Sequence, residues 1–233
     1  MGKRYGALLA VGLALGAAVA APASAATLAD WEMNEGPGAT VMVDSSGHVN
    51  GKIGSTVQTG FSFAGATAYH WIFTLPTAPP AQPQRLVTAS SSSLNPGSGN
   101  YTLTVRYRTT QHFGNIVQKG QAGSAGGYYK MENPNGKPRC LFRGQTSSGS
   151  YVAHIVQSPT VISNNQWQTI TCTRTATKLT LAVNGTVVST SNGSTGKISN
   201  TAPEMIAGKL YCDQISTTCD YFTGDIDYIK ISN

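Results

Sequence analysis

Short stretches in which polar and apolar side chains alternate constrain the fold of this chain more than any other feature. The stretch YTLTVRYRT places Tyr101, Leu103, Val105 and Tyr107 on one face and Thr and Arg side chains on the other. Because successive side chains of a β-strand point to opposite sides, a period of two predicts a half-buried strand. WQTITCTRT, NIVQKG, YYKMEN, RCLFRG and YVAHIVQ alternate similarly, and no longer stretch shows the apolar period of a helix.

Turn signals separate these stretches. In KLTLAVNGTVVST, Leu179, Leu181 and Val183 share a face, and Asn184–Gly185 then predicts a tight hairpin, because a type I′ turn needs positive φ at two residues. We count about a dozen strands of this kind. The sequence therefore predicts an all-β fold with two packed antiparallel sheets, a sandwich or a jelly roll.

Residues 1–25 read as a secretory signal peptide. Lys3 and Arg4 precede an apolar run over residues 7–21, and Ala23–Ser24–Ala25 ends it before Ala26. The run is shorter than the roughly 20 apolar residues that span a membrane. The Pro-rich stretch 76–84 lies between strands and marks no boundary, so residues 26–233 are expected to form one secreted domain with no membrane span.

The charge of the chain is weakly basic and dispersed. Charged residues make up 11% of the chain, and the formal net charge is +6. After the signal peptide, Lys and Arg form no run or cluster, which argues against nucleic acid as a partner. The surface is instead expected to consist of Ser, Thr, Asn, Gln and Gly.

Four cysteines follow the signal peptide, and an even number in an exported chain predicts two disulfides. Three pairings are open, and Cys140–Cys172 with Cys212–Cys219 is the simplest set. A zinc site is the alternative, but these spacings are poor for zinc.

Motifs of known enzymes are scarce. The pair Asp225 and Asp227 alternates as the carboxylates of a glucan-cleaving strand would, but it lies at the extreme end of the chain. No G-x-S-x-G or H-E-x-x-H pattern occurs. The tryptophans Trp31, Trp71 and Trp167 could stack on sugars, but each lies in an alternating strand, which favours packing.

The last strand carries a carboxylate that needs a partner. In FTGDIDYIKIS, simple alternation puts Asp227 on the same face as Ile229 and Ile231. A carboxylate beside an apolar face is costly unless it is paired, hydrogen-bonded or bound to a cation. Backbone N–H groups or a Ca²⁺ ion would each satisfy it.

The order of the motifs resembles a laminin G-like domain of the concanavalin A-like lectin/glucanase superfamily, in its secreted bacterial form. The resemblance rests on LADWEMNEGPGATVMVDSSGHVNGKI near the start, NIVQKGQAGSAGGYYKMENPNGKPRCLFRG, WQTITCTRT with LAVNG, and IAGKLYC…CDYF before FTGDIDYIKIS. It implies a jelly roll whose first and last strands are neighbours, and disulfides Cys140–Cys172 and Cys212–Cys219.

The resemblance also implies a structural Ca²⁺ between the ends of the chain. Asp44 and Asp227 match the ligand pattern, and Glu32 and Asn50 match it more weakly. The paired E-x-D-x-x-E strand of the glucan hydrolases and the motif set of the sandwich-fold lyases are both missing.

These observations predict a secreted, noncatalytic lectin-like module that binds a polysaccharide, a cell-surface glycan or another extracellular polymer. Arg106, His112 and Tyr129 are the candidate ligand-binding residues. The alternatives are an adhesion or structural domain with a protein partner, and a glycan-cleaving enzyme of the same fold that uses Asp225.

Overall fold

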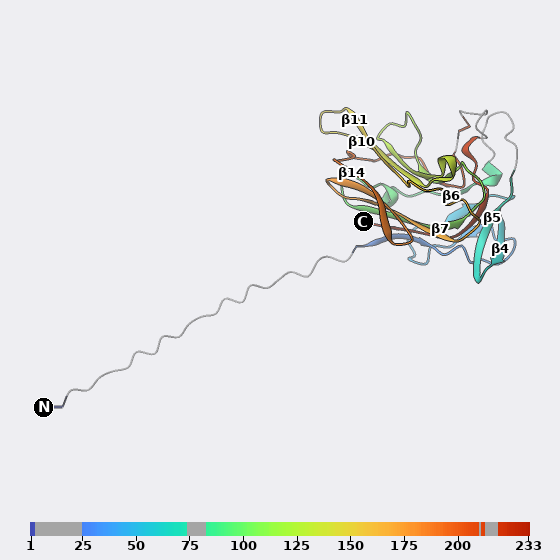
Figure 1. Cartoon of the computed structure of the whole chain (residues 1–233), viewed down its shortest axis with the longest axis horizontal. Helices are drawn as coiled ribbons and strands as arrows, with labels where there is room; N and C mark the ends of the chain where they lie inside the picture. The colour runs from blue at the N-terminus through green and yellow to red at the C-terminus, as the bar shows by residue number, and fades with distance from the viewer. Residues whose placement is uncertain (3–24, 74–82, 210, 213–218) are drawn as a thin grey trace.

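The computed structural model describes residues 1–2, 25–73, 83–209, 211–212 and 219–233, and it shows two β-sheets packed face to face (Figure 1). The predicted signal peptide, residues 1–25, lies almost entirely outside the described residues. Within the described residues, no helix is long and apolar enough to cross a membrane.

Sheet A is antiparallel, with the strand order β14-β13-β12-β7-β16-β5-β4 and with β1 paired to β16. Its strands are β1 (Thr27–Trp31), β4 (Gln58–Phe63), β5 (Ala66–Trp71), β7 (Tyr101–Arg108), β12 (Gln168–Arg174), β13 (Lys178–Val183), β14 (Thr186–Asn192) and β16 (Gly224–Ser232).

Sheet B is also antiparallel, with the order β11-β10-β9-β8-β15-β6-β3-β2. Its strands are β2 (Val41–Met42), β3 (Gly51–Ile53), β6 (Val87–Ala89), β8 (Asn115–Lys119), β9 (Tyr128–Glu132), β10 (Arg139–Gln145), β11 (Tyr151–Gln157) and β15 (Glu204–Ile206). Three short 3₁₀ turns complete the described elements: η1 (Pro83–Arg85), η2 (Ser92–Leu94) and η3 (Pro134–Gly136). The predicted two-sheet antiparallel sandwich is confirmed.

The alternation read from the sequence sets the inner face of β7. Tyr101, Leu103, Val105 and Tyr107 are all buried between the sheets, at 0–1% exposure. The hairpin between β13 and β14 is also confirmed, because Asn184 and Gly185 have φ of 49° and 81°, as a type I′ turn requires.

Two of the three tryptophans belong to the core. Trp31 and Trp71 are buried, and their indole N–H groups donate to Val49 O at 2.7 Å and Arg85 O at 2.8 Å. The interpretation of these two rings as packing residues is confirmed. Trp167 is partly exposed and lies outside the core.

The disulfides follow the predicted pairing. Cys140 of β10 bonds to Cys172 of β12, so this bond joins sheet B to sheet A through the core. The two residues are 32 apart in sequence, and closing such a loop stabilises the fold by roughly 4 kcal/mol in the chain-entropy model. Cys212 bonds to Cys219, with 4.8 Å between their Cα atoms.

The last strand lies in the middle of sheet A. One edge of β16 pairs with β7, and the other pairs with β5 and then with β1. The first and last strands are therefore neighbours, as the resemblance implied. This position obliges the chain to cross from β15 in sheet B to the centre of sheet A.

A β-bulge corrects one prediction for β16. Between Ile226 and Tyr228 the register with β7 shifts, so Asp227 has no partner of its own. Ile226 and Ile229 are both fully buried, although an uninterrupted strand would place them on opposite faces. The prediction that Asp227 shares a face with Ile229 is therefore wrong. The bulge turns Asp227 to the outer face, where it forms an ion pair with Arg106.

A chain of hydrogen bonds crosses the core near η2. The hydroxyls of Tyr101 in sheet A and Tyr129 in sheet B lie 2.6 Å apart, and Tyr129 donates to Oε2 of Glu204 at 2.6 Å. Burial raises the pKa of Glu204 to about 7, although Tyr129 and the charge of Lys119 both favour the ionised form. Its Oε1 atom has no hydrogen-bond partner.

This carboxyl group predicts how stability depends on pH. The folded protein keeps the Glu204 proton up to about pH 7, whereas the unfolded chain releases it near 4.5. Because the folded state then binds more protons, the free energy of unfolding should fall by roughly 3 kcal/mol as pH rises through this window. Urea melts of the wild type and Glu204→Gln measure this slope. The variant should lack this part of it, and an equal slope in both proteins would contradict the assignment.

Candidate functional site

The candidate site lies where β8 and β9 of sheet B meet the crossing from β15 to β16. Asn115 and Gln118 of β8 and Tyr128 and Lys130 of β9 form one wall of a pocket of about 90 Å³. Gln121 and Ala122 follow β8 and extend that wall. Lys209 and Asp220, which flank the Cys212–Cys219 disulfide in sequence, line it from the crossing segment.

Asn115 supplies the most informative atom of the pocket. Its Nδ2 donates to Oε1 of Gln118 at 2.6 Å, and Gln118 Nε2 donates in turn to Gly120 O at 2.6 Å. These two bonds fix the orientation of the amide. Asn115 is only 1% exposed, and its Oδ1 has no hydrogen-bond partner. A buried acceptor without a partner costs free energy, so a donor supplied by a ligand would be favoured there.

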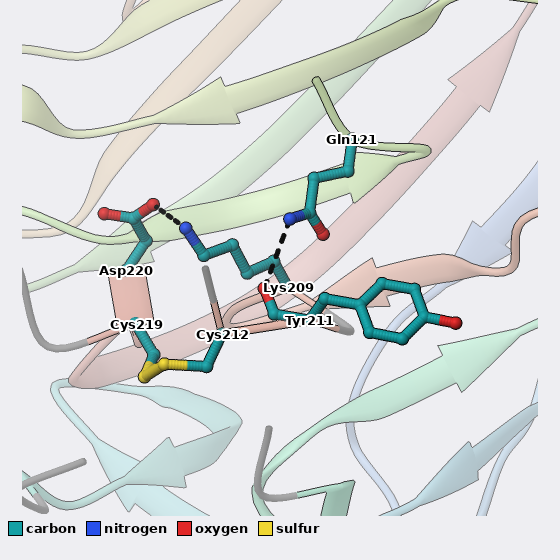
Figure 2. The surroundings of a disulfide bond; sticks show 6 residues. All are labelled: Gln121, Lys209, Tyr211, Cys212, Cys219 and Asp220. Atoms are coloured by element: carbon teal, nitrogen blue, oxygen red, sulfur yellow. Dashed lines mark hydrogen bonds and ion pairs between the residues drawn. A yellow bond between two sulfur atoms is a disulfide. The ribbon is translucent and has the colours of Figure 1, made fainter. Parts of the chain in front are cut away.

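The charged side chains that line this pocket all form ion pairs. Lys209 Nζ lies 2.8 Å from Asp220 Oδ2, as Figure 2 shows, and Lys130 Nζ lies 2.6 Å from Glu132 Oε2. The pocket therefore offers fixed polar groups without a large excess charge. Such a lining suits hydroxyl groups, which both donate and accept hydrogen bonds.

The Cys212–Cys219 disulfide belongs to the segment between β15 and β16, which also carries the pocket residues Lys209 and Asp220. Gln121 Nε2 donates to Tyr211 O at 3.2 Å, next to Cys212, so the loop after β8 is tied to the crossing segment (Figure 2). The Tyr211 ring points away from the disulfide and is 66% exposed. Tyr211 also lines a second pocket of about 60 Å³, together with Gln121, Met205 and others. An exposed ring at a pocket rim can stack on the C–H face of a sugar.

The loop after β8 is packed too closely to tolerate a side chain at Gly120, Gly126 or Gly127. A Cβ at Gly126 would lie 1.8 Å from Ser199 O, and one at Gly120 would lie 2.9 Å from Asn200 Nδ2. Gly126, Gly120 and Gly127 have positive φ, of 80°, 75° and 84°. Asn200 also donates to Gly127 O at 2.8 Å, so this rim of the site is rigidly built.

The three ligand-binding residues predicted from the sequence do not meet. Tyr129 is fully buried, and its hydroxyl contacts Tyr101 and Glu204, so it lies in the core and not on a binding surface. His112 is exposed in the loop after β7. Arg106 lies on the outer face of sheet A, with its guanidinium 5.0 Å from the centroid of the Trp167 ring. Alternation in the sequence predicts on which face of its strand a side chain lies. It does not predict whether side chains from different strands share one surface.

The two carboxylates considered for catalysis are also on the outer face of sheet A. Asp225 is 1% exposed and bonded to both Arg108 and His70, the latter at 2.5 Å from Nδ1. Asp227 forms its ion pair with Arg106. Each carboxylate is thus held by a cationic partner.

The predicted calcium ligands are satisfied by other groups. The carboxylate of Asp44 accepts five hydrogen bonds of 2.6–2.9 Å, from the backbone N–H groups of Asp30, Ser46, His48 and Val49 and from the Ser46 hydroxyl. Burial alone would raise the pKa of Asp44, but these hydrogen bonds outweigh it and the pKa is lowered.

Of the remaining predicted ligands, Asn50 contacts Asp44, whereas Glu32 and Asp227 are held by other partners. Glu32 lies 2.8 Å from Lys230, Asp227 pairs with Arg106, and Asn50 accepts from the Asp44 N–H at 2.9 Å. Among the described residues, no three His, Cys, Asp or Glu side chains are grouped as metal ligands would be. As placed, the four residues do not fit a calcium site.

This geometry predicts a small effect of a chelator. EDTA should shift the melting temperature by less than about 1 °C, because the donors around Asp44 come from the protein itself. Asp44→Ala should lower the melting temperature by several degrees with or without EDTA, since it leaves four buried or half-buried N–H groups without an acceptor. A clear drop on EDTA that Asp44→Ala abolishes would instead establish a calcium site.

Comparison with known proteins gives the family. A family model of the concanavalin A-like lectin/glucanases superfamily matches residues 82–233, which is more than half of the chain. The chain belongs to this superfamily. No curated protein sequence matches it.

Solved structures share the fold at low sequence identity. Domain 4 of AbnA, an extracellular arabinanase from Geobacillus stearothermophilus solved with arabinotriose, is 14% identical with a TM-score of 0.60, over 90% of this chain and 93% of that one. The binding domain of botulinum neurotoxin DC, solved with SialylT, is 13% identical with a TM-score of 0.60, over 88% and 47%. The binding domain of botulinum neurotoxin serotype G is 16% identical with a TM-score of 0.58, over 89% and 47%. The chain thus spans about half the length of the neurotoxin domains, and at these identities the likeness shows the fold.

Proposed function

We propose that this protein is a noncatalytic carbohydrate-binding domain that acts outside the cell and holds a saccharide in the pocket between β8, β9 and Asp220. The observation that carries the proposal is the polar pocket itself, one of whose lining residues, Asn115, has a buried Oδ1 without a hydrogen-bond partner. A sugar hydroxyl supplies the missing donor, and neighbouring amide and charged groups supply further polar contacts.

Two further features support a saccharide over other ligands. The Tyr211 ring stands exposed at the rim, where an aromatic face can cover one side of a sugar ring. The arabinanase domain and the neurotoxin DC domain, which share this fold, were each solved with a saccharide. The two disulfides suit the oxidising conditions outside the cell.

The site favours binding without cleavage. Glycoside hydrolysis requires two carboxyl groups on either side of the bond that breaks. Asp220 is the single carboxylate among the described residues that line the pocket, and it is paired with Lys209. The carboxylates Asp225 and Asp227 lie on the other sheet in ion pairs with arginines.

A glycan array followed by titration of the retained saccharide tests the proposal. Asn115→Ala and Tyr211→Ala should each weaken binding about 3-fold to 10-fold, the value of one hydrogen bond or one stacked ring. Tyr228→Ala, which removes a partly exposed ring from sheet A, is the matched control and should change affinity by less than about 2-fold.

Three results would contradict the proposal. The first is binding to no saccharide, and the second is equal affinity in the wild type and both pocket variants. The third is release of reducing sugar from the bound saccharide, because it would show that the domain cleaves its ligand.

A further inference from the structure

A third pocket adjoins the pocket of Tyr211 and differs in charge from the Asn115 pocket. It has a volume of about 310 Å³ and is lined by residues 90–92, residues 200–202 and Lys119. It shares Ala202 with the pocket of Tyr211, and that pocket shares Gln121 with the Asn115 pocket, so the three pockets adjoin one another. No carboxylate occurs among the described residues that line it, and Lys119 is their one cation.

The Lys119 ammonium group is built into this pocket. Lys119 is the last residue of β8, opposite both Glu204 of β15 and Tyr129 of β9, so its side chain enters on the inner side of sheet B. It is 1% exposed and donates one hydrogen bond, to Ala202 O. An ammonium group has three donors, and this carbonyl carries no full charge to balance it.

The nearby negative charge is that of Glu204, which lies behind the pocket and is not among its lining residues. Burial lowers the pKa of Lys119, and the charge of Glu204 offsets part of this effect. A second negative group on the open side of Lys119 would stabilise the ammonium form.

The rest of the lining suits an oxyanion. Ser90, Ser92 and Thr201 are exposed, and their hydroxyls can donate to an oxygen atom beside Lys119. Asn200 holds the 200–202 loop in place, because it bonds to Asn95, Gly127 and the Ala202 N–H. The pocket therefore keeps its shape without a ligand.

From this geometry we infer that the Lys119 pocket binds the carboxylate or sulfate group of an acidic sugar, next to a saccharide held at Asn115 and Tyr211. The inference rests on the proposed function, since the Lys119 pocket adjoins the pocket of Tyr211 at Ala202. It adds that acidic saccharides are the preferred ligands. Charge-assisted hydrogen bonds are about twice as strong as neutral ones, so one buried ammonium group suffices for discrimination.

The experiment compares a uronic acid oligosaccharide with the same oligosaccharide after carboxyl reduction, and with a sulfated form of the reduced one. The wild-type protein should bind the uronate or the sulfated form about 10-fold to 100-fold more tightly than the neutral form. Lys119→Met should remove this preference and leave affinity for the neutral form within about 2-fold. The oxyanion that shows the preference identifies the group bound.

Glu204→Gln should change the affinity for acidic ligands in the opposite direction from Lys119→Met. It keeps an acceptor for the Tyr129 hydroxyl but removes the charge behind Lys119, so acidic ligands should bind more tightly at pH 7.5 while the neutral one is unchanged. The wild-type comparison needs no variant and decides the question even if Lys119→Met folds poorly. Equal affinity for all three ligands would overturn the inference and leave the proposed function standing, whereas no binding of any saccharide would overturn both.

Discussion

The position of β16 is the constraint on which the rest of the structure depends. Because the last strand lies between β7 and the pair β5 and β1, the chain must leave sheet B after β15 and cross to the centre of sheet A. The two ends of the crossing are fixed by hydrogen bonds: Ala207 N donates to Ile116 O at 2.9 Å, and Phe222 N donates to Ala207 O at 3.1 Å. Lys209, Tyr211 and Asp220 are thereby brought beside β8. The candidate site is thus a consequence of how the sandwich is closed.

Burying the polar side chains near this crossing costs folding free energy. This cost favours the interpretation that these residues have a function. β8 carries Asn115, Gln118 and Lys119, all at 1–3% exposure, in a strand that also contributes to the core. Glu204 of the neighbouring strand β15 is fully buried, and one of its oxygens has no hydrogen-bond partner. Apolar residues could fill these positions in a purely structural strand. Local conflicts of this kind are expected at functional sites.

Some of this architecture could be predicted from residue patterns and some could not. The period of two in β7 and the Asn184–Gly185 turn depend on neighbours in sequence, and both were confirmed. The face of Asp227 was predicted wrongly, because a bulge inserts one residue and no residue type announces it. The pattern NIVQKG predicts a strand, but it does not predict that the polar residues of this strand line a site. The signal was present, since three long polar side chains in a strand that must be buried in part are unusual.

The meeting of Asn115, Gln121, Lys209 and Asp220 depends on the crossing between the sheets, which sequence spacing does not reveal.

Mapping the bound saccharide by NMR tests this account most directly. Titration with a saccharide that the protein retains should shift the backbone amide signals of Asn115, Gln121 and Tyr211 and leave those of Arg106 and Trp167 unchanged. Shifts confined to the outer face of sheet A, around Arg106 and Trp167, would place binding elsewhere and contradict the account.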